Sequence, residues 1–159
     1  MTRSALWAAV FGALVGSFAA AVGYTAHYAR ATSYLSEDPK ACINCHVMNE
    51  QYDGWSRSPH HARATCNDCH VPHSSIFAKY YVKAEHGYRH SKLFTLNSFH
   101  EPIRANAASH AVVIANCIRC HEAMTREIRL AAPGSSAHTV SGGIDCIRCH
   151  AAVAHGPTR

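Results

Sequence analysis

The sequence contains little charge, and its apolar residues are distributed too unevenly to give a soluble domain a full core. Only 16% of the 159 residues are charged, which argues against a disordered, tail-like protein. Hydrophobic residues make up 48% of the chain, but many of them lie in one N-terminal run. The length excludes a large two-lobed nucleotide-binding fold, and the remaining roughly 130 residues could bury only a modest core. We therefore expect something other than side chains to fill the interior.

Asp, Glu, Lys and Arg are all absent between Arg3 and Arg30. The most apolar part of this segment, residues 5–24, is long enough as a helix to cross the roughly 30 Å hydrocarbon core of a bilayer. It predicts a single-pass transmembrane helix in the cytoplasmic (inner) membrane, with Arg3 on the cytoplasmic side. A cleaved signal peptide, with its cleavage site near Ala19-Ala20-Ala21, is the alternative interpretation.

No cysteine lies outside one pattern, Cys-x-x-Cys-His, which occurs four times and uses all 8 cysteines. The copies are Cys42-Ile43-Asn44-Cys45-His46, Cys66-Asn67-Asp68-Cys69-His70, Cys117-Ile118-Arg119-Cys120-His121 and Cys146-Ile147-Arg148-Cys149-His150. The pattern indicates c-type heme, which two thiols attach through thioethers and the histidine ligates. Zinc is a weaker alternative, and disulfide pairing would leave the repeated histidine unexplained. We predict four heme c groups in the oxidising periplasmic compartment.

The rest of the chain shows helical patterns and no alternating strand pattern of convincing length. Helices are expected at 78–96, 103–115 and 122–132, followed by a loop at 133–143. The predicted fold class is mostly α: a transmembrane anchor over residues 1–30, then a small helix-and-loop multiheme domain over 31–159. The hemes would form the core of that domain, which accounts for its shortage of apolar side chains.

The basic balance of the chain, a formal net charge of +5, does not indicate a nucleic-acid-binding protein. Each heme carries two propionates, and these offset the excess of lysine and arginine. The arginines are expected to pair with propionates and with the headgroups of membrane lipid.

The chain holds 14 histidines, and only four of them stand in the heme motifs. His46, His70, His121 and His150 are the proximal ligands that the motifs predict. Distal positions number at most four, so most of the other histidines are expected to be surface residues or propionate contacts. Met48 follows His46 by two residues, which places a thioether beside the first heme, either as an iron ligand or as ordinary packing.

These motifs, taken in order, resemble the NapC/NrfH family of membrane-anchored tetraheme quinol dehydrogenases, and within it the nitrite-reductase type. The resemblance is carried by SYLSEDPKACINCHVMNEQY (33–52), SPHHARATCNDCHVPH (58–73), KAEHGYRHSKLFT (83–95), ANCIRCH (115–121) and CIRCHAAVAHG (146–156). It implies a subunit that oxidises menaquinol and passes electrons to a periplasmic pentaheme cytochrome c nitrite reductase catalytic subunit. The implied assembly is a hetero-oligomer, in which this chain is not itself the nitrite-reducing subunit.

The resemblance also implies an axial ligand set. Met48, rather than His46, would ligate the first heme. His70 would ligate the second heme, whose other face would be turned to the partner subunit. The third heme would use His121 and His155, and the fourth His150 and His61.

The quinol site implied by the resemblance contains Lys83, at the position of the family's quinol-site lysine. His90 falls where some members carry an acidic residue, so it could accept the quinol proton, ligate iron or only line the pocket. Two other functions stay open from the residues themselves. One is a soluble or anchored multiheme electron carrier for a different terminal reductase, and the other is a stand-alone reductase acting at the first heme.

Overall fold

The computed structural model describes residues 2–131, 139–140 and 143–156 of the chain. It divides the chain into two compact units, Met1–Ser36 and Glu37–Arg159. The domain boundary predicted from the sequence lies between residues 30 and 31, and it stays a prediction. Each unit is described separately below.

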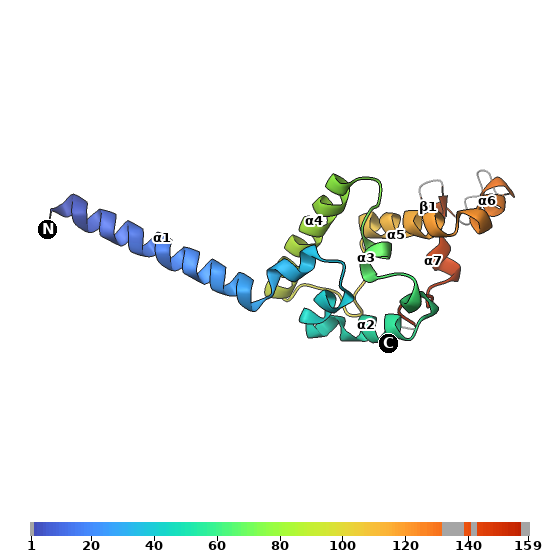
Figure 1. Cartoon of the computed structure of the whole chain (residues 1–159), viewed down its shortest axis with the longest axis horizontal. Helices are drawn as coiled ribbons and strands as arrows, with labels where there is room; N and C mark the ends of the chain where they lie inside the picture. The colour runs from blue at the N-terminus through green and yellow to red at the C-terminus, as the bar shows by residue number, and fades with distance from the viewer. Residues whose placement is uncertain (1, 132–138, 141–142, 157–159) are drawn as a thin grey trace. The chain divides into compact units, whose positions relative to one another are not determined.

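The first unit is dominated by one long helix, α1 (Arg3–Tyr28), labelled in Figure 1. Its mean hydropathy reaches 2.0, and none of its most apolar window is buried by the rest of the protein. By length and composition the helix could cross a membrane. It extends beyond the predicted 5–24 at both ends, and the rings of Tyr24 and Tyr28 stack at its C-terminal end, 6.2 Å between centroids. A short 3-10 helix, η1 (Ala31–Leu35), follows it.

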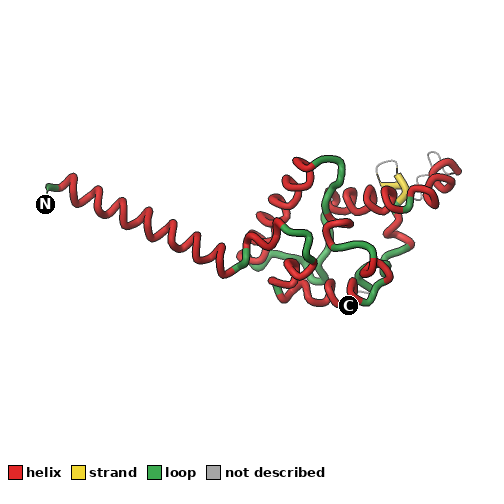
Figure 2. The backbone as a smooth tube through the Cα atoms, in the orientation of Figure 1, coloured by secondary structure: helices red, strands yellow, loops and turns green. Residues whose placement is uncertain are grey.

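The second unit consists of helices joined by loops (Figure 2). Its α-helices are α2 (Asn49–Ser56), α3 (Cys66–His70), α4 (Ile76–Thr95), α5 (Ala107–Cys120), α6 (Glu122–Ala131) and α7 (Cys146–Cys149). Its 3-10 helices are η2 (Pro39–Asn44), η3 (His46–Met48) and η4 (Pro59–Ala62). Two short antiparallel strands, β1 (Thr139–Val140) and β2 (Gly143–Ile144), complete the described elements. The prediction of a mostly α fold with one N-terminal apolar helix is confirmed.

Local capping explains where the helices begin. Helix α4 begins two residues before the predicted start, because Ser75 Oγ accepts a hydrogen bond from the Ala78 amide at 3.1 Å. Helix α5 begins at Ala107 rather than at the predicted residue 103. Asn106 Oδ1 accepts from the Ser109 amide at 2.7 Å, so the N-cap sits four residues beyond Pro102.

The remaining segments are helix α6, the predicted loop at 133–143 and helix α2. Helix α6 agrees with the predicted 122–132 to within one residue. Most of the predicted loop at 133–143 lies outside the described residues, and its described part forms β1 and the start of β2. Helix α2 was not predicted, because its eight residues contain too few apolar positions for a helical period to stand out.

The described side-chain core is small. The apolar residues that are buried are Ala41, Trp55, Val71 and Ile114. Three of them lie close to a heme motif in the sequence: Ala41 directly precedes the first, Val71 directly follows the second, and Ile114 lies three residues before the third. The polypeptide therefore packs a few apolar groups next to its cysteine motifs.

Candidate functional site

Each Cys-x-x-Cys-His motif coincides with a short helical segment. The second motif is helix α3, the third ends α5, and the fourth is helix α7 with the histidine just beyond it. The first motif differs, because η2 ends within it and η3 begins at His46. In a helix, residues three apart lie on one face, so the two thiols of a motif point the same way.

The residues of these motifs fit covalent heme attachment. All 8 cysteines lie among the described residues, none of them is paired in a disulfide there, and each is half-buried or exposed. Two adjacent accessible thiols followed by an imidazole are the donor set that a c-type heme requires. The small apolar core beside the motifs agrees with a domain in which porphyrins supply further packing.

Motifs that follow one another in the sequence are also neighbours in space. Cys66 of the second motif lowers the pKa of Cys42 in the first to about 7, and Cys42 in turn raises the pKa of Cys66. Burial first, and then charges that include Cys120, raise the pKa of Cys69. Burial and the nearby Cys146 raise the pKa of Cys117 to about 11. The first motif therefore lies next to the second, the second next to the third, and the third next to the fourth.

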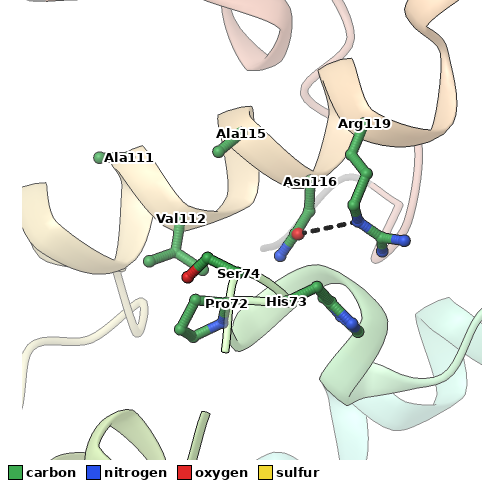
Figure 3. Close-up of a pocket in the computed structure, with 8 residues that line it drawn as sticks. All are labelled: Pro72, His73, Ser74, Ala111, Val112, Ala115, Asn116 and Arg119. Carbon is green, nitrogen blue, oxygen red and sulfur yellow. Dashed lines mark hydrogen bonds between the residues drawn. The ribbon is translucent and has the colours of Figure 1, made fainter. Parts of the chain in front are cut away.

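The buried side-chain amide of Asn116 connects the second motif to the third by hydrogen bonds. Asn116, immediately before Cys117, donates from its Nδ2 to the carbonyl oxygens of Cys69 at 3.0 Å and Val71 at 2.8 Å. Arg119 Nε donates to Asn116 Oδ1 at 3.3 Å, and Figure 3 shows both side chains extending from α5 toward the segment at Pro72 and His73. A groove of about 490 Å³ lies between these elements. The contact fixes the relative position of two neighbouring heme sites.

Replacing Asn116 by Ala is expected to destabilise the protein by about 1–3 kcal/mol, because two backbone carbonyls lose their donor. Thermal unfolding of the holoprotein, followed by circular dichroism, measures the change. Arg119→Ala is the matched control, since its contacts are longer, and it should lower the melting temperature less. An Asn116→Ala protein that melts at the wild-type temperature would contradict this role.

His70 and His155 are brought together by the fold. Their ring centroids are 5.9 Å apart. Burial first, and then the neighbouring His155, His86 and His90, lower the pKa of His70 to about 4, so its ring is neutral near pH 7. His155 Nδ1 lies 2.9 Å from the carbonyl oxygen of Gln51. A carbonyl only accepts, so Nδ1 carries the proton and the Nε2 lone pair is available to a metal.

His121 has a different ring neighbour from the one that the resemblance implies. The ring of His60 lies 6.1 Å from the ring of His121, and His60 Nδ1 lies 3.4 Å from the carbonyl oxygen of Val153. The ring of His61 instead packs edge-to-face with the ring of Trp55, 4.7 Å between centroids. The pairings of His121 with His155 and of His150 with His61 therefore stay predictions. Sequence reasoning did not single out His60, although the paired histidines before the second motif were a visible signal.

The first motif shows an asymmetry between its two candidate ligands. The side chain of His46 is exposed, whereas Met48 is half-buried at the end of η3. The Met48 amide donates to the Cys45 carbonyl at 2.9 Å, which turns the chain tightly after the motif. This placement agrees with Met48, rather than His46, facing inward.

Lys83, on α4, lies beside the first motif. Its charge is among those that lower the pKa of Cys42, which places the two side chains in one neighbourhood. Lys83 Nζ donates to Glu37 Oε1 at 2.9 Å, and Lys79 Nζ donates to the same oxygen at 2.8 Å. The Lys83 ammonium also lies 5.7 Å from the ring centroid of Tyr80. Sequence reasoning missed Glu37, since nothing local links it to residues 46 positions away.

His90 lies two turns beyond Lys83 on α4, where a spacing of seven residues returns to nearly the same face. Its ring stacks on that of His86, 5.7 Å between centroids. Burial is the main reason that the pKa values of both rings are lowered. His90 is an electrostatic neighbour of His70 in the second motif. Lys83 therefore faces the first motif and His90 the second.

The sequence and the fold both match known cytochromes. The sequence profile of the NapC/NirT cytochrome c family, N-terminal region, matches residues 2–159. Cytochrome c-type protein NrfH of Wolinella succinogenes is 39% identical, over 94% of this chain and 88% of that protein. Cytochrome c nitrite reductase subunit NrfH of Nitratidesulfovibrio vulgaris is 33% identical, over 72% of this chain and 65% of that protein.

A solved structure agrees with these sequence matches. A chain in the crystal structure of the cytochrome c nitrite reductase NrfHA complex, bound to the HQNO inhibitor, superposes with a TM-score of 0.61 at 29% identity. The match covers 95% of this chain and 92% of that one. The family resemblance inferred from the motifs is confirmed, and it establishes heme c as the cofactor. The chain belongs to the NapC/NirT cytochrome c family.

Proposed function

We propose that this protein is the quinol-oxidising electron-transfer subunit of a nitrite reductase complex. It oxidises menaquinol and delivers the electrons to a periplasmic pentaheme nitrite reductase, which makes ammonium. The observation that carries the proposal is the lysine site before the first motif, where Glu37, two residues before η2, holds Lys83 Nζ at 2.9 Å, together with the contacts that join successive motifs. The similarity to NrfH proteins and to a chain of the NrfHA complex supports the same assignment.

In the proposed arrangement residues 1–30 anchor the protein in the cytoplasmic membrane and residues 31–159 form the periplasmic tetraheme domain. The apolar helix α1 supports the anchor by its length and composition. Arg3 at the start of α1 favours a cytoplasmic N-terminus. Covalent attachment of c-type heme outside the cytoplasmic membrane requires the same orientation of the cysteine motifs.

The proposed ligand set assigns chemistry to residues of this chain. Met48 ligates the first heme, His70 the second, His121 and His155 the third, and His150 and His61 the fourth. When bound, the hemes accept and pass on single electrons. The half-buried Met48 and the Nε2 lone pair of His155 support their roles. The chain fixes the spacing of the sites through contacts such as that of Asn116.

Quinol oxidation releases two protons as well as two electrons, so the site needs a group to orient the headgroup and a proton acceptor. Lys83 suits the first role, because its ammonium can donate to a quinol oxygen beside the first motif. His90 suits the second, because burial lowers its pKa and so leaves a neutral imidazole that can accept a proton. Both side chains belong to one helix, so α4 sets their separation.

Membrane fractions of cells that contain this protein and its partner test the proposal. After a high-salt wash, the pellet is expected to retain the heme absorbance and to reduce nitrite with a naphthoquinol as electron donor. The anchor holds the protein in the bilayer by apolar burial, which salt does not weaken. Release of the hemes into the soluble fraction would indicate a soluble carrier. Quinol-driven heme reduction without nitrite reduction would indicate a different terminal reductase.

A further inference from the structure

One carboxylate oxygen holds two lysines of α4. Glu37 Oε1 accepts from Lys79 Nζ at 2.8 Å and from Lys83 Nζ at 2.9 Å. The lysines are four residues apart, one helical turn, so both ammonium groups reach the same side of α4. Asp38 follows Glu37 and caps η2 by accepting from the Lys40 amide at 2.9 Å. Glu37 and its two lysines therefore lie directly before η2, the segment that carries Cys42.

The two lysines differ in their exposure to solvent. The Lys83 side chain is 7% exposed, whereas that of Lys79 is 25% exposed and that of Glu37 is 47% exposed. An enclosed ammonium needs a counter-charge, because water no longer solvates it. Glu37 supplies that charge to the enclosed lysine and is itself accessible from solvent. Lys79 contributes a second positive charge at the exposed side of the cluster.

Glu37 stays ionised under any physiological condition. Partial burial raises the pKa of its carboxyl, but the hydrogen bonds and charges of Lys79 and Lys83 outweigh this and lower the pKa to about 2. The pKa of Lys79 is raised, first by its hydrogen bond to Glu37. The depressed carboxyl pKa contributes stability that is present above the ordinary value of 4.5 and is lost as the pH falls toward about 2.

We propose that Glu37 is the positioning residue of the quinol site, which holds the Lys83 ammonium in place beside the first heme motif. The inference rests on the proposed quinol-oxidising function and adds a residue to it. An ammonium carries three N–H donors, so a bond to Glu37 is compatible with a second bond to a quinol oxygen. Because the hydrogen bond to Glu37 already restricts the Lys83 side chain, that side chain loses less conformational entropy when a quinol binds. The quinol therefore binds more tightly.

Glu37→Gln keeps the size of the side chain and removes its charge. In membranes that contain the complex, this variant is expected to raise KM for a water-soluble naphthoquinol by about 10-fold, the effect of losing one charge-assisted contact. Affinity for HQNO, the inhibitor bound by the structurally similar complex, should weaken in parallel. The kcat should stay within about 3-fold of the wild-type value, because the variant loses orientation of the bound quinol and not the hemes that receive its electrons.

The groups that contact the Lys83 ammonium include Glu37, which also binds Lys79, and the ring of Tyr80. Lys79→Met is the matched control, because it removes the other ammonium and leaves the Glu37–Lys83 pair intact. It should change KM and HQNO affinity less than 3-fold, on the order of a surface ion pair. Glu37→Asp keeps the charge on a shorter arm and should restore most of the wild-type affinity for the quinol and for HQNO.

Glu37→Gln with full heme content and unchanged KM and HQNO affinity would overturn the inference. If Glu37→Gln does not assemble, the same measurements are made on Glu37→Ala, which also removes the charge, and wild-type KM and HQNO affinity there would overturn it. Lys83→Ala separates this inference from the proposed function. Normal quinol oxidation by Lys83→Ala contradicts the quinol site, whereas a defective Lys83→Ala beside a normal Glu37→Gln contradicts only the role of Glu37.

Discussion

Lys83→Ala is expected to retain four hemes and to lose quinol-driven heme reduction, with kcat/KM lower by about 100-fold, or about 3 kcal/mol. The Lys83 ammonium is the enclosed cation beside the first motif. Alanine leaves that position without a donor for the quinol oxygen. The measurement is the rate of heme reduction after a naphthoquinol is added, with dithionite used to establish the total reducible heme.

Lys92→Ala is the matched control for this variant. Lys92 lies on the same helix, and its ammonium lies 5.9 Å from the ring centroid of Tyr88 rather than beside the first motif. It should reduce its hemes at the wild-type rate. If both variants behave alike, the lysine acts through the general charge of α4. A Lys83→Ala protein with an unchanged rate would remove Lys83 from quinol oxidation.

The features that the sequence predicted are those with a local cause. The heme motifs depend on residues within five positions of one another, and α1 depends on an uninterrupted apolar run. Helix α4 was predicted almost to its ends because its apolar and basic residues alternate with a helical period. The boundary of α5 was wrong because the Asn106 cap decided the helix start and Pro102 did not.

The features that the sequence could not predict depend on contacts across the chain. Glu37 binds Lys83 from 46 positions away, and Asn116 reaches Cys69 of the second motif from 47 positions away. No local pattern marks a carboxylate or an amide that will find such a partner. The ring neighbours of His60 and His155 are also long-range, so spacing alone left ten histidines without a role.

The order of the motifs in space gives these separate contacts one functional meaning. The lysines that bind Glu37 lie beside the first motif. Asn116 joins the second motif to the third through its hydrogen bonds. The fourth motif contacts the third through α5 and α7. A quinol that binds beside the first motif would therefore pass its electrons to the second and later motifs through these contacts.

Removing the first heme and removing the fourth should consequently have different effects. Cys42→Ala/Cys45→Ala eliminates the attachment site beside Lys83, so a naphthoquinol should reduce almost none of the three remaining hemes. Cys146→Ala/Cys149→Ala eliminates the site at the other end, so a naphthoquinol should still reduce its three hemes at nearly the wild-type rate. Dithionite should reduce three hemes in both variants, and mass spectrometry should show one heme fewer than in the wild type.

The two variants control for each other, because each removes two thiols and one heme from a terminal motif. Equal loss of quinol-driven reduction in both would mean that the hemes exchange electrons without a fixed order. Loss only in Cys146→Ala/Cys149→Ala would place the quinol at the fourth motif and contradict the role of Lys83. Loss only in Cys42→Ala/Cys45→Ala is the result that the serial contacts require, because the enclosed lysine neighbours Cys42.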